Sequence, residues 1–168
     1  MRSTYKYLAY AICALVVAQA AFIVYANAGL FHWVSEEGGT LDKAFIDDES
    51  STFPGLGGFI LHGMSGTMLI PLVALAVLVV SFFTKVKGAA VHGAAIVALV
   101  VIQVTLGMTA HSVPALGPLH GINAFILLGT AFHAARLMSS PRLASAPTVG
   151  KDATIPAQPG ADATQLQA

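Results

Sequence analysis

Residues 58–83 read GFILHGMSGTMLIPLVALAVLVVSFF and contain no Asp, Glu, Lys or Arg. A helix needs about 20 apolar residues to cross a hydrocarbon core about 30 Å thick, and this run is longer than that. A bilayer offers no water to the backbone, so a spanning segment must satisfy its own hydrogen bonds as a helix. The run therefore predicts one transmembrane helix.

Three further apolar runs flank this one, at about residues 7–30, 89–110 and 118–138. Arg136, near the end of the last run, is the only charged residue in the three. Charged residues make up 10% of the 168 residues and mean hydropathy is +0.76, whereas a soluble domain carries about 25% charged residues. The sequence predicts an all-α, four-helix transmembrane bundle over residues 1–138, with the lipid bilayer as its solvent.

The charges predict how the bundle is oriented. Of the eight Lys and Arg residues, only Lys43 falls on the side of the polar connection 31–57, and that connection holds six of the eight acidic residues. The positive-inside rule then places both termini and the turn with Lys85 and Lys87 in the cytoplasm, and the 31–57 loop outside. We expect a multi-pass protein of a cell membrane, with a bacterial cytoplasmic membrane as the compartment. The formal net charge of zero argues against a nucleic-acid partner.

Both ends of the chain allow specific expectations. Arg2 and Lys6, followed by an apolar run and Ala26-Asn27-Ala28, resemble a signal peptide with a cleavage site after Ala28. The apolar part of a signal peptide is only about 7–15 residues long, so we expect this longer run to be retained as a helix. Residues 139–168 are rich in Ala, Pro, Thr and Gln and have few large apolar side chains, which predicts a disordered cytoplasmic tail.

Histidines stand out in so apolar a chain, because ionisable groups within a membrane are costly and tend to be functional. Four lie in the predicted helices and two at their outer ends: His62, His92, His120 and His133, then His32 and His111. His62 and His120 lie at matched depth near the outer ends of the second and fourth helices, among small residues such as Gly66. This predicts a bis-histidine heme b site in the bundle. Small residues that merely allow close helix packing, with lone interfacial histidines, are the alternative.

His92 and His133 form a second pair of matched depth, near the inner helix ends. His120 and His133 are 13 residues apart and so point about 140° from each other on one helix, which favours one heme over two. Gln103 lies deep in the third helix, where we expect an interhelical hydrogen bond; a quinone or substrate contact is the alternative. Met108 is an alternative axial ligand at the depth of His120.

The segments QVTLGMT (103–109) and LHGINA (119–124), joined by a short loop with Pro114, resemble the heme A synthase family of cytochrome oxidase assembly proteins. The resemblance implies one four-helix half of an eight-helix fold. It also implies heme ligands near the outer starts of the second and fourth helices, at His62 and His120. The family's catalytic half carries a Glu just before the second-helix His, where this chain has Phe59, and the outer-loop Cys pair of many members is absent. The resemblance therefore implies heme binding without implying oxidation of heme O.

The function predicted from the sequence is heme binding, for electron transfer or heme handling, with a membrane redox complex or a second copy of the chain as partner. Whether the protein is an enzyme stays open. One alternative is a cofactor-free accessory or assembly subunit of a larger membrane complex. Another is an outer-face metal site built from His32, Glu36, His111 and His120.

Overall fold

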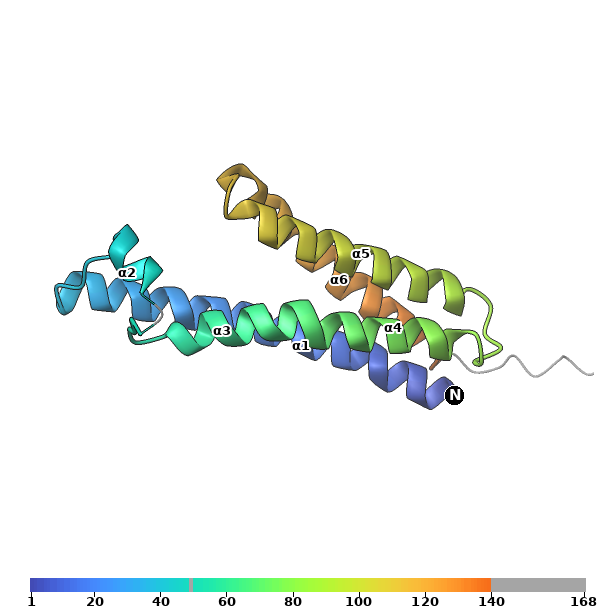
Figure 1. Cartoon of the computed structure of the whole chain (residues 1–168). Coiled ribbons are helices and arrows are strands. Elements are labelled where there is room, and N and C mark those ends of the chain that lie inside the picture. Colours follow the sequence, from blue (N-terminus) through green and yellow to red (C-terminus); the bar gives the residue numbers. More distant parts are fainter. Residues whose placement is uncertain (49, 140–168) are drawn as a thin grey trace, which may run out of the picture.

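The computed structural model describes residues 1–48 and 50–139 (Figure 1). The described chain is helical and contains no strand, and four of its helices are long and apolar enough to cross a membrane. This confirms the predicted all-α membrane bundle. The predicted cytoplasmic tail, apart from Ser139, lies outside the described residues.

The elements follow one another with short connections. They are α1 (Arg2–Glu36), α2 (Lys43–Asp47), α3 (Leu56–Met64), the π-helical turn η1 (Ser65–Leu69), α4 (Ile70–Ser81), α5 (Ala89–Ala110), the 3-10 turn η2 (Pro114–Leu116) and α6 (Gly117–Leu137). α3, η1 and α4 form one continuous membrane helix. The observed bounds of the second, third and fourth spanning helices lie within about two residues of those predicted.

α1 is longer than predicted, and the 31–57 connection is shorter. α1 begins at Arg2 and continues to Glu36, and the chain leaves the helix just before Gly38, whose φ of 72° is left-handed. Its 35 residues span about 52 Å at 1.5 Å each, which exceeds a hydrocarbon core of about 30 Å. Part of α1 therefore extends beyond the membrane.

An aromatic cluster holds the loop after α1 against this extension. The ring centroid of Trp33 lies 4.6 Å from that of Phe45 and 5.9 Å from that of Phe53, and Phe53 in turn contacts Phe59 at the start of α3. α2, which the sequence did not predict, carries Phe45 into this cluster. The loop is thus an ordered cap on one end of the bundle.

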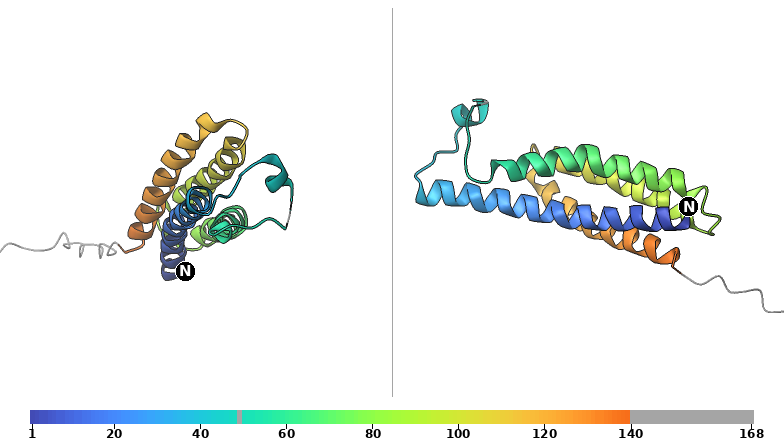
Figure 2. Two further views of the ribbon diagram at one scale, coloured as in Figure 1. Left: turned by 90° about the vertical axis from the view of Figure 1, so that its left-hand side faces the viewer. Right: turned by 90° about the horizontal axis from the view of Figure 1, so that it is seen from below.

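The four long helices form two hairpins, α1 with α3–α4 and α5 with α6 (Figures 1 and 2). We call the end with the N-terminus and the 82–88 turn the basic end. The opposite end, with residues 37–48, 50–55 and the 111–116 turn, is the acidic end. Near the basic end α4 packs on α5 and α1 packs on α6. The buried core lies mainly there, and its largest buried side chains are Tyr5, Ile12, Ile96, Leu127 and Val77. Toward the acidic end the α5–α6 hairpin stands away from α3 (Figure 1).

A π-helical turn interrupts the second membrane helix just after His62. Pro71 has no amide hydrogen and its ring would crowd the carbonyl of Thr67 in a regular α-helix. The widened turn absorbs this conflict, with the amide of Ile70 donating to the carbonyl of Ser65. The Thr67 hydroxyl donates to the carbonyl of Gly63, so a side chain also satisfies a backbone acceptor in this turn. Such turns occur often at functional sites.

Candidate functional site: a pocket with two facing histidines

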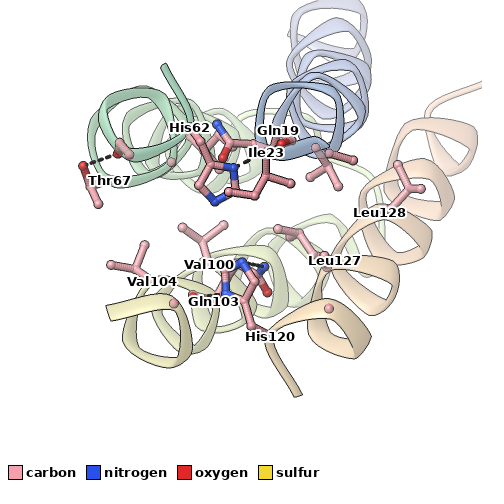
Figure 3. Close-up of a pocket in the computed structure, with 18 of the residues that line it drawn as sticks. Gln19, Ile23, His62, Thr67, Val100, Gln103, Val104, His120, Leu127 and Leu128 are labelled. Carbon is pink, nitrogen blue, oxygen red and sulfur yellow. Dashed lines mark hydrogen bonds between the residues drawn. The ribbon is translucent and has the colours of Figure 1, made fainter. Parts of the chain in front are cut away.

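A pocket of about 520 Å³ lies between the two hairpins, in the half of the bundle toward the acidic end. Side chains from α1, from the continuous helix α3–η1–α4, and from α5 and α6 line it (Figure 3). Its volume is within the range of about 300–1,000 Å³ typical of small-molecule sites. The lining is apolar or glycine with five polar exceptions, which are Gln19, His62, Thr67, Gln103 and His120. His62, His120, Gln103 and Gly66, all predicted from the sequence, thus share one pocket.

His62 is oriented by a hydrogen bond to α1. Its Nδ1 lies 3.1 Å from the main-chain oxygen of Gln19. A carbonyl oxygen can only accept, so Nδ1 carries the hydrogen, and in the neutral ring Nε2 carries the lone pair. The side-chain amide of Gln19 is directed elsewhere, because its Nε2 donates to Ser65 Oγ at 2.5 Å.

His120 is held in the same way by α5. Its Nδ1 donates to the main-chain oxygen of Gln103 at 3.0 Å. Its Nε2 lies 3.1 Å from the side-chain amide nitrogen of Gln103. The hydrogen bonds of Asn123 determine which of these two nitrogens donates. Asn123 Nδ2 donates to the carbonyl of Leu99 at 2.9 Å and to Gln103 Oε1 at 2.6 Å, so Gln103 Nε2–H must face His120. His120 Nε2 therefore accepts a hydrogen bond and bears a lone pair.

The two imidazoles face each other across the pocket (Figure 3), with ring centroids 6.2 Å apart and ring planes inclined by 52°. A metal–imidazole bond is about 2.1 Å long and the ring centre lies about 1.2 Å behind its nitrogen, so two axial imidazoles on one ion have centroids about 6.5 Å apart. The observed separation fits this span. In metal sites the second ring nitrogen donates to a carbonyl or carboxylate, as both Nδ1 groups do here.

Glycines provide the room for this arrangement. A Cβ atom on Gly107 would lie 2.9 Å from Cε1 of His120, so the His120 ring rests directly on the α5 backbone. A Cβ on Gly66 would lie 3.2 Å from Gln19 Oε1. Gly63 and Gly121, each next to a pocket histidine, line the pocket, and an added Cβ at either would meet nothing within 4 Å. Gly107 and Gly66 thus allow a neighbouring side chain to approach the backbone closely, whereas Gly63 and Gly121 leave the pocket wide.

His92 and His133 come together as well, near the basic end, but in a different geometry. Their rings stack with centroids 5.1 Å apart and planes inclined by only 29°, and His92 Nδ1 donates to the carbonyl of Gly88. The sequence argument from helix angles did not lead us to expect this contact. Stacked rings leave no slot between them for a macrocycle, in contrast to the His62–His120 pair.

Other predicted site residues have mixed outcomes. The interhelical hydrogen bond predicted for Gln103 is confirmed, and Met108 lines the pocket with its side chain largely exposed. The outer-face metal site is not assembled: within residues 1–48 and 50–139 no group of three or more His, Cys, Asp or Glu is placed to hold an ion. His32 instead pairs with Glu37 at 3.4 Å.

Sequence reasoning missed the roles of Asn123, Gly107 and Ser65. Asn123 is 7% exposed and three residues after His120, so the two share a helix face. Gly107 follows Gln103 by four residues and shares its face in the same way. This spacing was a signal available in the sequence, whereas the Gln19–Ser65 contact depends on how α1 packs against the π-helical turn.

Comparison with protein families, with curated proteins and with solved structures finds no match for this chain. We therefore infer what this protein binds from the geometry of the pocket.

Proposed function

We propose that this protein binds one heme b in the pocket between its two hairpins, with His62 and His120 as the axial ligands. The observation that carries the proposal is the pair of facing imidazoles 6.2 Å apart, each with its Nδ1–H committed to a main-chain carbonyl. That arrangement leaves the Nε2 lone pair of each ring for a ligand, at His62 directly and at His120 once its hydrogen bond with the Gln103 amide is given up. A helix-bundle interior lined by small and apolar residues suits a flat, largely apolar macrocycle.

The carbonyls and the apolar side chains around the pocket then have specific roles. The carbonyls of Gln19 and Gln103 hold the two rings in the required tautomer and orientation. The apolar walls exclude water and so stabilise the site's less charged redox state. Bound heme supplies one-electron chemistry, and two axial imidazoles favour electron transfer or heme handling over oxygen chemistry.

Placement in the membrane is part of the proposal. The basic residues near the N-terminus and the 82–88 turn support a cytoplasmic basic end in a bacterial cell membrane, with the pocket in the outer half. A membrane redox complex, or a second copy of the chain that completes an eight-helix assembly similar to heme A synthase, is the proposed partner.

Spectra of alanine variants test the assignment of the ligands. Wild-type protein purified in detergent with heme should be low-spin and six-coordinate, and His62→Ala or His120→Ala should lose heme or give a high-spin spectrum. His92→Ala and His133→Ala are the controls and should keep the wild-type spectrum. A wild-type spectrum in both His62→Ala and His120→Ala would refute the proposal. Loss of about half the heme in the two controls would instead reveal a second heme.

A further inference from the structure

The two hairpins hold their histidines by the same device, a glutamine on one helix and a histidine on its neighbour. In the first hairpin the main-chain oxygen of Gln19 accepts from His62 Nδ1. In the second, the main-chain oxygen of Gln103 accepts from His120 Nδ1. The two halves of the site match to this point, and Figure 3 shows Gln19 beside His62 and Gln103 beside His120.

The side-chain amides of the two glutamines, in contrast, have different hydrogen-bond partners. The Gln19 amide donates to Ser65 Oγ, so it is engaged away from the His62 ring. The Gln103 amide donates to His120 Nε2, the same atom that would bind a metal. Asn123 fixes the Gln103 amide in this orientation through its bond to Oε1. A ligand that binds His120 must therefore displace a hydrogen bond that a ligand on His62 does not.

We infer that the two axial positions are unequal: His62 is the permanent heme ligand and His120 is an exchangeable one, with Gln103 as the positioning residue that stabilises His120 when it is off the iron. This rests on the proposed function and deepens it. A small neutral ligand such as carbon monoxide should enter on the His120 side, and heme should leave by releasing His120 first. An exchangeable ligand favours heme handling over a purely electron-carrying role.

The size of the effect follows from one hydrogen bond. A neutral hydrogen bond contributes about 1 kcal/mol net, and that corresponds to about a fivefold change in an equilibrium or rate. Gln103→Leu removes the donor that captures free His120 Nε2 and leaves the main-chain carbonyl in place. His120 should then stay on the iron longer.

The experiment follows carbon monoxide binding to the reduced, heme-loaded protein in detergent by the change in its Soret absorption. Gln103→Leu should slow binding about fivefold, because release of His120 limits the rate. Thr105→Val is the control on the same helix and should bind at the wild-type rate, since Thr105 does not line the pocket and its hydroxyl donates to the carbonyl of Val101 within α5. His62→Ala should weaken heme binding more than His120→Ala does.

A second readout needs no heme. In the heme-free protein labelled with ¹⁵N-histidine, Gln103→Leu should shift the Nε2 resonance of one histidine, and Thr105→Val should shift none. An unchanged carbon monoxide rate in Gln103→Leu, or an equal effect of Gln103→Leu and Thr105→Val, overturns the inference while the heme site stands. A wild-type protein that takes up no heme overturns the proposed function and this inference together.

Discussion

Replacing Gly107 with Ala probes the proposed heme site with a single added carbon. The new Cβ would lie 2.9 Å from Cε1 and 3.1 Å from Nδ1 of His120, whereas ordinary contact begins at 3.4 Å. In the heme-free protein two hydrogen bonds to Gln103 hold the ring, and they can lengthen to let it move away from the methyl group. With heme bound, the iron would hold the ring more firmly, so most of the strain falls on the bound state.

Overpacking of this kind costs about 1–3 kcal/mol, which corresponds to a roughly 5- to 150-fold increase in the dissociation constant for heme. Gly129→Ala is the matched control, because Gly129 lies on α6 outside the pocket and its Cβ would meet nothing within 4 Å. Both variants gain about 1 kcal/mol of helix propensity, so that effect cancels between them. The assay is heme titration of the heme-free protein followed by absorption. Equal affinity in the two alanine variants would refute the reasoning about the close approach of His120 to α5.

Three further predictions concern the rest of the molecule. Gly29→Ala should destabilise the junction of α1 with the loop before α3 by about 1–3 kcal/mol, because its Cβ would lie 1.8 Å from the Pro54 oxygen. The fluorescence of Trp33 on heating measures this loss of stability. Gly57→Ala is the control and should be unaffected, because its Cβ would meet nothing within 4 Å. Neutralising Glu36, Glu37, Asp47 and Asp48 together should weaken binding of a basic partner at low salt and leave the heme spectrum unchanged; loss of the heme band would move the site out of the bundle. A reporter enzyme that works only outside the cytoplasm, fused after Ala168, should be inactive, and activity would reverse the predicted orientation.

The membrane helices could be predicted from the sequence because hydrophobic length alone decides which segments span a bilayer. The bounds of α5 agree with the predicted 89–110, since charged or turn-forming residues flank the apolar run on both sides. α1 could not be bounded in this way, because its polar ends at Arg2 and Glu36 are equally compatible with a helix that leaves the membrane. The rule for spanning segments gives a minimum length and no maximum.

The site was predictable in part. Matched depth placed His62 and His120 at one level, and the structure brings their rings within 6.2 Å of each other. Depth could not show which nitrogen each ring presents, since that depends on the carbonyls of two other helices. The stacking of His92 on His133 was missed for a related reason: the angle between residues of one helix says little about which face a neighbouring helix covers.

Titration of the purified, heme-free protein with heme decides whether the pocket is a heme site, with absorption recorded in the oxidised and reduced states. We expect saturation at one heme per chain and a six-coordinate, low-spin spectrum that the double variant His62→Ala/His120→Ala does not give. A wild-type protein that shows no saturable uptake, or uptake that the double variant reproduces, would contradict this expectation.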